Sequence, residues 1–388
     1  MKPTILKHGT IYQSDHVFGY AGWPTLTKLK DGTLVCVYSG DRLAHVCPFG
    51  RVLMSKSFNG GESWSAPMTV MNTALDDRDG GIAVFGENRD KVIVTSFTNT
   101  IKMQIEYATT PDHPHHQYAG QEPNPGLTVA YFDKMEKAGV AEIREKEALG
   151  STYVISFDNC NSFTDFTLLP ITAPHGPCVL NDGSLFYVGR NFSSEKGEDA
   201  IYGKYHALKK GIYYMTGKDG KTWTDAVEIP MVFTEQQKEW MFCEPYALQL
   251  SSGRILVHIR VHKFENGEQI GCGIYQCHSD NMGESWTQPK QIVDVGFPSH
   301  LTQLKNGWII CSYAIRFGEQ KGERVIVSKD DGETWSEEFI LRDDGVDGDL
   351  GYPSTVELDD GALLTAYYHK LQGRTKPGIY YTKWKLEY

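Results

Sequence analysis

One short turn-like sequence occurs five times in this chain, and it constrains the fold more than any other feature. Each copy starts at Ser or Thr, passes through an Asp or Asn and, with one exception, a Gly, and ends at Trp or Phe. The Asp or Asn side chain can cap backbone amides of a hairpin turn, the Gly accepts a positive φ, and the aromatic residue can pack back against the strand. The copies are 57-SFNGGESW-64, 156-SFDNCNSF-163, 216-TGKDGKTW-223, 279-SDNMGESW-286 and 328-SKDDGETW-335.

A second repeat, offset from the first, has the pattern of strand, tight turn and strand. It occurs six times, and every unit except the last is followed by a third strand that leads into a copy of the turn. Six units of about four strands predict an all-β fold, a six-bladed β-propeller that extends over residues 1–388 as a single domain. The early strand 9-GTIYQ-13 is expected to complete the last blade, beside 379-IYYTKWKLEY-388. The units span residues 22–42, 78–97, 175–190, 244–260, 299–316 and 351–369.

Residues 103–150 interrupt this rhythm within the second blade. Their first part, which includes TTPDHPHHQYAGQEPNPG, is predicted to be a loop, and residues 127–150 have a helical pattern that ends at Gly150. An insertion of this size inside a blade predicts a rim or a lid over the central funnel, and a plain decoration of the fold is the alternative.

The net charge of −11 argues against a nucleic-acid backbone or an anionic membrane surface as partner, although a local arginine cluster could still bind a small anion. The N-terminus has no apolar segment typical of a signal peptide, and no apolar run approaches the ~18 residues of a membrane span. The eight cysteines lack CxxC spacing. We therefore expect a cytoplasmic protein with reduced thiols.

Candidate site residues lie where the blades begin and where their second strands end. Histidines among them could act as acid or base near neutral pH, but none has the spacing of a metal site such as HExxH, so no metal or other cofactor is predicted. Blades begin with Trp23, Asp79, His175, Glu244, His300 and Tyr352. Arginines at equivalent strand ends suggest a ring around a central pocket: Arg42, Arg190, Arg260 and Arg316. Two further candidates for ligand binding are Arg78, beside Asp79, and His45.

These features together resemble the sialidase superfamily of propellers, whose turn repeat is called the Asp-box. The resemblance implies that Tyr352 is the nucleophile, since sialidases carry a tyrosine at the start of the last blade. It implies that Glu244, which opens a blade and is followed by Arg260, activates this tyrosine. Asp79 matches an aspartate of the substrate pocket, and Arg42 lies where sialidases have an arginine after the first hairpin.

The implied chemistry is consistent with an acidic sugar. A carboxylate nucleophile would be repelled by the carboxylate on the anomeric carbon of a sialic acid, and sialidases use a tyrosine instead. A phenol with a pKa near ~10 needs a neighbouring base, which Glu244 would provide at about 3 Å. Arg260 and Arg316 would hold the substrate carboxylate through bidentate hydrogen bonds.

The chain also departs from the sialidase pattern. Sialidases open the first blade with Arg-Ile-Pro, whereas this chain has Gly22-Trp23-Pro24, so one arm of the carboxylate clamp is missing. Arg51 occupies the place expected for the acid/base aspartate. The substitutes are Asp79 or a histidine, His45 or His300, and Asp41 lies near the same place.

The sequence thus predicts an exo-acting glycoside hydrolase that acts on an acidic sugar, sialic-acid-like or uronic, at the central funnel. Its partner would be a small carbohydrate or the end of a glycan. Two alternatives remain open. The propeller could be a polysaccharide lyase or another glycosidase, in which Tyr352 or a histidine moves a proton, or it could bind glycans without catalysis, with Tyr352 and Glu244 as packing and capping residues.

Overall fold

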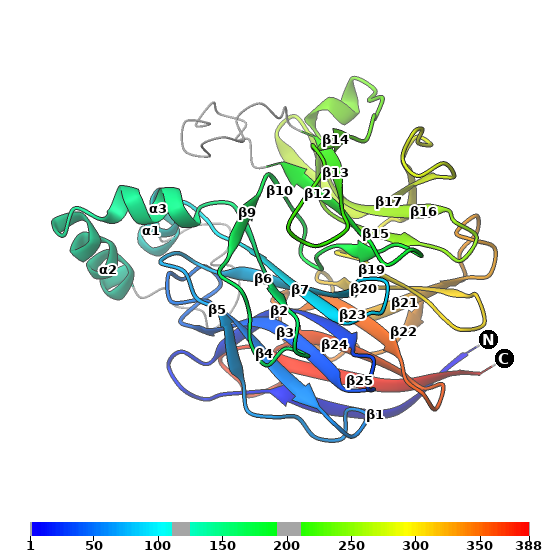
Figure 1. Cartoon of the computed structure of the whole chain (residues 1–388), viewed down its shortest axis with the longest axis horizontal. Helices are drawn as coiled ribbons and strands as arrows, with labels where there is room; N and C mark the ends of the chain where they lie inside the picture. The colour runs from blue at the N-terminus through cyan, green and yellow to red at the C-terminus, as the bar shows by residue number, and fades with distance from the viewer. Residues whose placement is uncertain (1, 111–124, 192–210, 388) are drawn as a thin grey trace.

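The computed structural model describes residues 2–110, 125–191 and 211–387. Within these residues the strands form six antiparallel sheets that follow one another along the chain as the blades of a propeller (Figure 1). The predicted fold class is therefore confirmed. Blade 1 contains β2 (Tyr20–Lys28), β3 (Leu34–Arg42), β4 (Arg51–Ser57) and β5 (Met68–Met71). Blade 2 contains β6 (Arg78–Phe85), β7 (Lys91–Phe97), β8 (Ser151–Ser156) and β9 (Thr167–Leu169).

The remaining blades repeat this order, with the first strand innermost. Blade 3 has β10 (Ile171–Thr172), β11 (Cys178–Val179), β12 (Leu185–Asn191), β13 (Ile212–Gly217) and β14 (Val227–Glu228). Blade 4 follows a 3₁₀ helix (Gln236–Glu239) and has β15 (Met241–Gln249), β16 (Ile255–Glu265), β17 (Glu268–Ser279) and β18 (Lys290–Val293). Blade 5 has β19 (His300–Gln303), β20 (Ile309–Ile315), β21 (Gly322–Ser328) and β22 (Phe339–Ile340).

Blade 6 closes the ring with both ends of the chain. It contains β23 (Gly351–Glu357), β24 (Leu363–His369), β25 (Gly378–Glu387) and, as its outermost strand, β1 (Lys2–Tyr12). β1 pairs with β25 from Lys2 opposite Glu387 to Tyr12 opposite Ile379, and the two chain ends lie side by side (Figure 1). The predicted closing strand is confirmed, and it begins earlier than Gly9, at Lys2.

Each copy of the repeated turn connects the third and fourth strands of one of blades 1 to 5. In blade 1, Asn59 Oδ1 accepts a hydrogen bond from the Ser63 amide at 3.0 Å, and Ser57 Oγ accepts one from the Gly61 amide at 2.9 Å. The terminal aromatic residue, however, does more than pack on its own strand. Trp335 of blade 5 donates to Gln276 of blade 4 at 3.0 Å, so the repeated turn also seals the interface between neighbouring blades.

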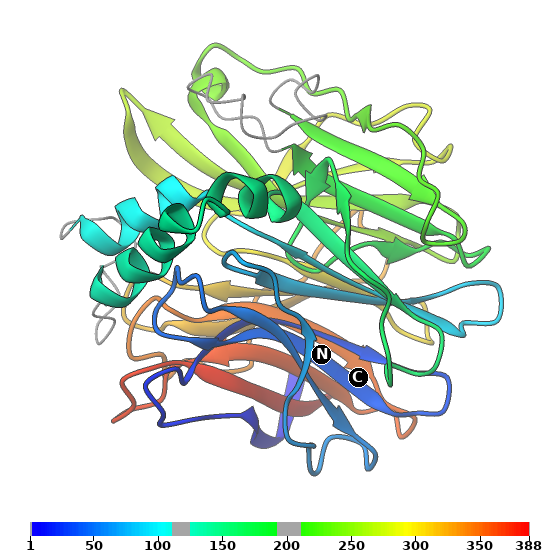
Figure 2. The same cartoon turned by 60° about the vertical axis from the view of Figure 1, so that its left-hand side comes forward.

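The insertion between β7 and β8 consists of α1 (Ile101–Thr109), α2 (Pro125–Lys137) and α3 (Ala141–Ala148), which pack together at one side of the propeller (Figure 2). The sequence pattern predicted helix only after residue 127, whereas α1 adds a helix capped by Thr100, whose hydroxyl accepts from the Met103 amide. Residues 111–124, in the predicted loop, lie outside the described residues. In the described part of the chain, no helix is long and apolar enough to cross a membrane.

The helices rest on the loop that follows β3. Tyr107 of α1 is buried against Leu43, Ala44, Val46 and Cys47, and the Tyr131 ring of α2 lies 5.3 Å from the Phe49 ring. The insertion therefore supports the segment that carries His45, one of the candidate site residues. Whether it also acts as a lid stays a prediction.

Candidate active site

Blades 1, 2, 4 and 6 of the described structure begin with the same irregularity. The register with the second strand shifts near the start of the innermost strand, and each shift contains one non-glycine residue with a positive φ. Positive φ is strained for such side chains, at about 1–3 kcal/mol each, and bulges of this kind redirect a side chain. The four residues are Trp23 (φ 55°), Asp79 (49°), Glu244 (45°) and Tyr352 (53°). Three of them precede a proline, which makes this backbone geometry still less favourable.

At the starts of blades 3 and 5, the residues differ from those that the sequence alignment predicted. The sequence places His175 and His300 at these blade starts. In blade 5 the residue that matches Tyr352 in the pattern Gly-X-Pro is Phe297, whereas blade 3 has His175-Gly176-Pro177 and so has no side chain directly before its proline. His300 lies three residues beyond Phe297, opposite Ser312, at the register where blade 4 has Tyr246. Sequence reasoning missed Phe297, although Gly-Phe-Pro at 296–298 repeats Gly-Trp-Pro at 22–24 and Gly-Tyr-Pro at 351–353.

His175 and His300 instead belong to a cluster of buried rings near Tyr352. The His300 ring stacks on Tyr246 at 4.6 Å, and His175 lies 5.1 Å from His300 and 6.2 Å from Tyr352. Burial lowers the pKa of His300 to about 3 and that of His175 well below its ordinary value. Both imidazoles are therefore neutral near pH 7.

The structure brings together Tyr352 of blade 6 and Glu244 of blade 4. The Tyr352 hydroxyl donates to Glu244 Oε1 at 2.8 Å, which confirms the predicted separation of about 3 Å. Arg260 Nη1 donates to Glu244 Oε2 at 2.6 Å and lies 3.5 Å from the Tyr352 oxygen. A phenol, a carboxylate and a guanidinium thus form one connected group.

The electrostatics of this group assign the protons. Burial would raise the pKa of Glu244, but Arg260 lowers it below its ordinary value. Burial and the nearby Glu244 charge raise the pKa of Tyr352 well above 10. Near neutral pH an ionised Glu244 therefore accepts a hydrogen bond from a protonated Tyr352, which is the arrangement of a base beside the nucleophile that it activates.

Asp79 is the third carboxyl or hydroxyl group at a strained blade start. Its side chain is buried, with 5% of the residue exposed, and Oδ1 has no hydrogen-bond partner among the described residues. Burial raises the pKa of Asp79 to about 7, with Arg78 opposing and Glu244 adding to this shift. A carboxyl group that titrates near neutral pH in a buried site is suited to donate and accept a proton. By contrast, Asp41 forms a partly exposed pair with Arg51 at 3.6 Å.

Phe297 joins two of the predicted arginines. The Arg260 guanidinium stacks on the Phe297 ring at 3.8 Å, and that of Arg316 lies 5.7 Å from the same ring. Arg316 donates to the Gly348 carbonyl and to the Tyr368 hydroxyl. Arg190 lies on β12, with its Nη1 3.7 Å from Met241 Sδ.

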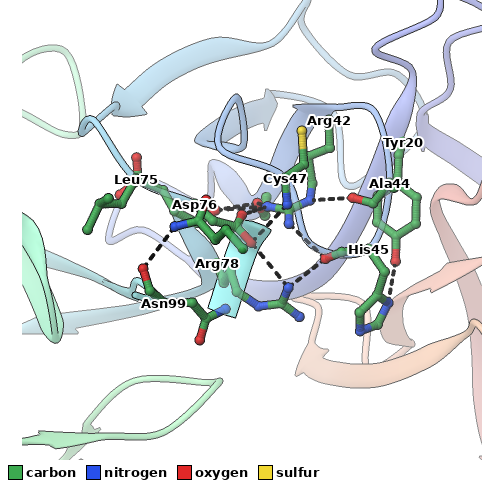
Figure 3. Close-up of polar contacts among 12 residues, drawn as sticks. Tyr20, Arg42, Ala44, His45, Cys47, Leu75, Asp76, Arg78 and Asn99 are labelled. Carbon is green, nitrogen blue, oxygen red and sulfur yellow. Dashed lines mark hydrogen bonds and ion pairs between the residues drawn. The ribbon is translucent and has the colours of Figure 1, made fainter. Parts of the chain in front are cut away.

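Arg42 stabilises the fold of blade 1 rather than lining an open site. Its side chain is fully buried and pairs with the equally buried Asp76 at 2.6 Å (Figure 3). It also donates to the carbonyls of Ala44, His45 and Asp77 and to the Ser39 hydroxyl. The expected contact between Arg42 and a substrate is therefore not available in this conformation, because no part of its side chain is exposed.

His45 is held by the loop that Arg42 braces. Its Nδ1 lies 2.9 Å from the Tyr20 oxygen and 3.2 Å from Asp349 Oδ1, and its carbonyl accepts from both Arg42 and Arg78 (Figure 3). Burial lowers the pKa of His45 well below its ordinary value, and Arg78 lowers it further. His45 is thus a neutral, fixed imidazole near neutral pH. Among the described residues, no cluster of His, Cys, Asp and Glu is arranged to hold a metal ion.

The chain has the six-bladed propeller fold found in sialidases and in related arabinan-degrading glycosidases. It is similar to a protein of unknown function from Dyadobacter fermentans, with 18% identity, a TM-score of 0.72 and 99% of each chain covered. It is also similar to the NanB sialidase from Streptococcus pneumoniae, with 14% identity and a TM-score of 0.63, over 97% of this chain and 70% of the sialidase chain.

A third similar structure is an α-L-arabinanase from Penicillium chrysogenum, with 15% identity, a TM-score of 0.61 and 98% of each chain covered. No protein-family model matches the sequence, and no curated protein sequence matches it. At these identities the comparisons establish the fold, and the activity must be argued from the site.

Proposed function

We propose that this protein is an exo-acting glycoside hydrolase that cleaves an acidic sugar, sialic-acid-like or uronic, from the end of a glycan. The observation that carries the proposal is the 2.8 Å hydrogen bond between Tyr352 and Glu244, formed by two strained residues at equivalent bulges of blades 6 and 4. Strain at two equivalent positions that meet in one hydrogen bond supports a functional rather than a packing role.

In the first step, Tyr352 Oη attacks the anomeric carbon while Glu244 accepts the phenolic proton. Arg260, 3.5 Å from the phenolic oxygen, stabilises the negative charge that develops there. Asp79 has a pKa of about 7, so near pH 7 about half of the molecules carry its proton. The protonated Asp79 donates this proton to the oxygen of the leaving group. The products are a glycosyl-tyrosine and the free alcohol.

In the second step, the Asp79 carboxylate removes a proton from water, and the water oxygen attacks the anomeric carbon from the face that the leaving group vacated. The bond to Tyr352 breaks and the phenolate recovers its proton from Glu244. Two displacements at one carbon retain the anomeric configuration.

The preference for an acidic sugar follows from two features of the site. A tyrosine nucleophile is advantageous where the reacting carbon bears a carboxylate, because a carboxylate nucleophile would be repelled. The guanidinium groups of Arg260 and Arg316 share the Phe297 ring, so two positive charges lie near each other where they can attract a substrate carboxylate.

Turnover of aryl glycosides tests this proposal, with sialic acid, glucuronic acid and neutral arabinofuranose as the glycosyl groups. The wild type should hydrolyse an acidic member with retention, and Tyr352→Phe and Glu244→Gln should lower kcat by about 10³-fold or more. Tyr187→Phe is the matched control, since Tyr187 is an equally buried tyrosine whose hydroxyl accepts from the Ala173 backbone amide in the core of blade 3.

Three results would overturn the proposal in different ways. An unsaturated product that absorbs in the near ultraviolet would identify a lyase. Binding of the acidic sugars without any turnover would identify a glycan-binding protein. Full activity of Tyr352→Phe would remove the nucleophile from the mechanism.

A further inference from the structure

We propose that Trp23 and Arg78 together replace the arginine that the first blade lacks, with Arg78 as a third contact for the acidic group of the substrate and Trp23 as the residue that positions it. This inference rests on the proposed function and assigns the substrate specificity of the same site to a pair of residues from two blades.

Trp23 occupies the position in blade 1 that Tyr352 occupies in blade 6. Both lie in a register shift at the start of the innermost strand, between Gly22 and Thr25 and between Gly351 and Ser354. The indole ring is buried, with 1% of the residue exposed. A side chain at this position therefore belongs to the same ring of residues as the proposed nucleophile, but the indole fills the place without offering a charge.

Two guanidinium groups contact the indole. Arg42 Cζ lies 4.8 Å and Arg78 Cζ 4.2 Å from the ring centroid, which is the distance of a cation–π contact. An arginine in place of Trp23 would bring a third cation within this distance of two others, at a considerable electrostatic cost. The indole avoids that repulsion and attracts both guanidinium groups. The arginine that sialidases have at this position is therefore replaced in this chain by a residue that holds two other arginines.

Of these two arginines, only Arg78 has donors left for a ligand. Arg42 is completely buried and bonded to five protein groups. Arg78 uses Nη1 for the His45 carbonyl and for Asp76 Oδ2, at 2.5 and 3.4 Å. Among the described residues, the hydrogen bonds of the Arg78 guanidinium are made by Nη1 and none by Nε or Nη2, and in Figure 3 no dashed line joins its outer nitrogen to the residues drawn. Two donors on one side of a planar guanidinium match the two oxygens of a carboxylate.

Ring contacts connect Arg78 to the side of the site that holds Tyr352 and Arg316. Arg78 lies over the Trp23 ring, and Tyr368, whose ring is near Trp23, also has its ring 5.9 Å from that of Tyr352. Burial lowers the pKa of His45, and the charges of Arg78, Arg316, Arg42 and Arg260 lower it further. Burial would lower the pKa of Arg78, but the neighbouring carboxylates of Asp76 and Asp79 raise it, so its guanidinium stays charged. Tyr368 connects the two sides, because its ring lies 5.8 Å from Trp23 and its hydroxyl accepts from Arg316.

Paired substrates distinguish a contact with the acidic group from a general structural effect. KM and kcat are measured for an aryl glucuronide and for the aryl glucoside that lacks its charge, and for an aryl sialoside and its methyl ester. Arg78→Gln should raise KM for the charged member of the active pair by about 10- to 100-fold, the value of a charge-assisted hydrogen bond, and should change the uncharged member little. Arg78→Lys should restore only part of the loss, because an ammonium group lacks the forked geometry.

Trp23→Leu should weaken the same selectivity less than Arg78→Gln does, and Trp23→Phe should retain most of it because a phenyl ring still supports a cation. Arg89→Gln is the matched control: Arg89 is a partly buried arginine of the same blade that donates to the carbonyls of Val84 and Leu180, at the turn between β6 and β7. The thermal midpoint of each variant confirms that it is folded. A loss that is equal for charged and uncharged substrates, or no change in either, would overturn the assignment of Arg78.

Equilibrium binding separates this inference from the proposed function. Calorimetric titration with free N-acetylneuraminic acid and glucuronic acid, and with glucose as the uncharged probe, requires no turnover. If the wild type binds an acidic sugar without hydrolysing it and Arg78→Gln loses this binding, the hydrolase proposal fails and the role of Arg78 stands. If hydrolysis proceeds and Arg78→Gln binds the acid as the wild type does, the role of Arg78 fails and the hydrolase stands.

Discussion

Replacement of Asp79 by Asn should stabilise this protein at alkaline pH while it removes most of the activity. Asp79 is buried, one of its carboxyl oxygens has no partner among the described residues, and its pKa in the folded protein is about 7 against an ordinary 3.8. An amide of nearly the same shape does not ionise, so Asp79→Asn removes the cost of placing a negative charge at this position.

The sign and size of the effect follow from the two pKa values. The pKa of Asp79 is higher in the folded protein than in the unfolded chain. The free energy of unfolding is therefore highest below pH 3.8, where Asp79 is protonated in both states, and it falls as the pH rises to about 7. The difference between the two pKa values corresponds to a decrease of about 4 kcal/mol in the free energy of unfolding of the wild type between pH 4 and pH 8. The advantage of Asp79→Asn should therefore rise from near zero at pH 4 to at most about 4 kcal/mol at pH 8, or ~5 °C in Tm for a chain of this length.

Thermal unfolding of wild type and variant between pH 4 and pH 8 measures this difference. Asp158→Asn is the control of opposite sign: hydrogen bonds from Ser162 lower the pKa of the exposed Asp158 in the repeated turn, and blades 1 and 4 already have Asn59 and Asn281 in this position. That variant should lose stability relative to the wild type as the pH rises. In the activity assay, Asp79→Asn should lower kcat by about 10²- to 10⁴-fold on a glycan substrate. The decrease should be smaller for an aryl glycoside, because its leaving group departs without needing a proton.

A stability difference between wild type and Asp79→Asn that does not change with pH would refute the reasoning, because the pH dependence comes only from the ionisation of Asp79. A variant that is fully active on a glycan with a sugar leaving group would leave the pKa argument intact and would remove Asp79 from the mechanism. The two measurements thus test the electrostatics and the chemistry separately.

Three further outcomes follow from the structure. The pH profile of kcat/KM should be bell-shaped, with a fall below pH 4.5 as Glu244 becomes protonated and a fall above about pH 7 as Asp79 loses its proton, and a flat profile across this range would contradict both roles. Gly61→Ala should cost about 2–4 kcal/mol in chemical denaturation, because the added methyl would lie 2.3 Å from Leu364 Cδ1 at a φ of 89°, whereas Gly60→Ala, with open space at a φ of 68°, should cost only about 1 kcal/mol. Deletion of residues 1–12 should expose the β25 amides that pair with β1 to hydrogen exchange, whereas unchanged protection of 378–387 would show that β1 does not close the ring.

The sequence predicted the blades because their determinants are local. A repeated turn with its capping Asp or Asn can be recognised within eight residues, as in 328-SKDDGETW-335, and the alternating strands beside it are equally short-range. The helix α1 was missed because only Gly150 and the charge pattern after residue 127 gave a helical signal, whereas Thr100 and its cap lay before the predicted insertion.

The candidate site could be predicted only in part, since it depends on which residues meet across blades. Tyr352 and Glu244 stood out at blade starts in the sequence, and the structure places them in contact across 108 residues of chain. His300 was chosen in blade 5 because the extra residue before it is invisible without the strand register. Phe297 was overlooked although the Gly-X-Pro repeat marks it in the sequence. Nothing in the sequence distinguishes Arg42 from Arg260, although the first is sealed against Asp76 and the second lies beside Glu244.

The amino-acid sequence by itself determined the number of blades, the strand that closes the ring and the residues at the starts of blades 1, 2, 4 and 6, because periodicity and turn chemistry act over a few neighbouring residues. The tertiary structure decided which of those residues carry a charge, which arginines remain accessible and which carboxyl group titrates near neutral pH. These properties depend on burial and on charges that the fold brings together from distant blades, and burial and charge set the protonation state of each group.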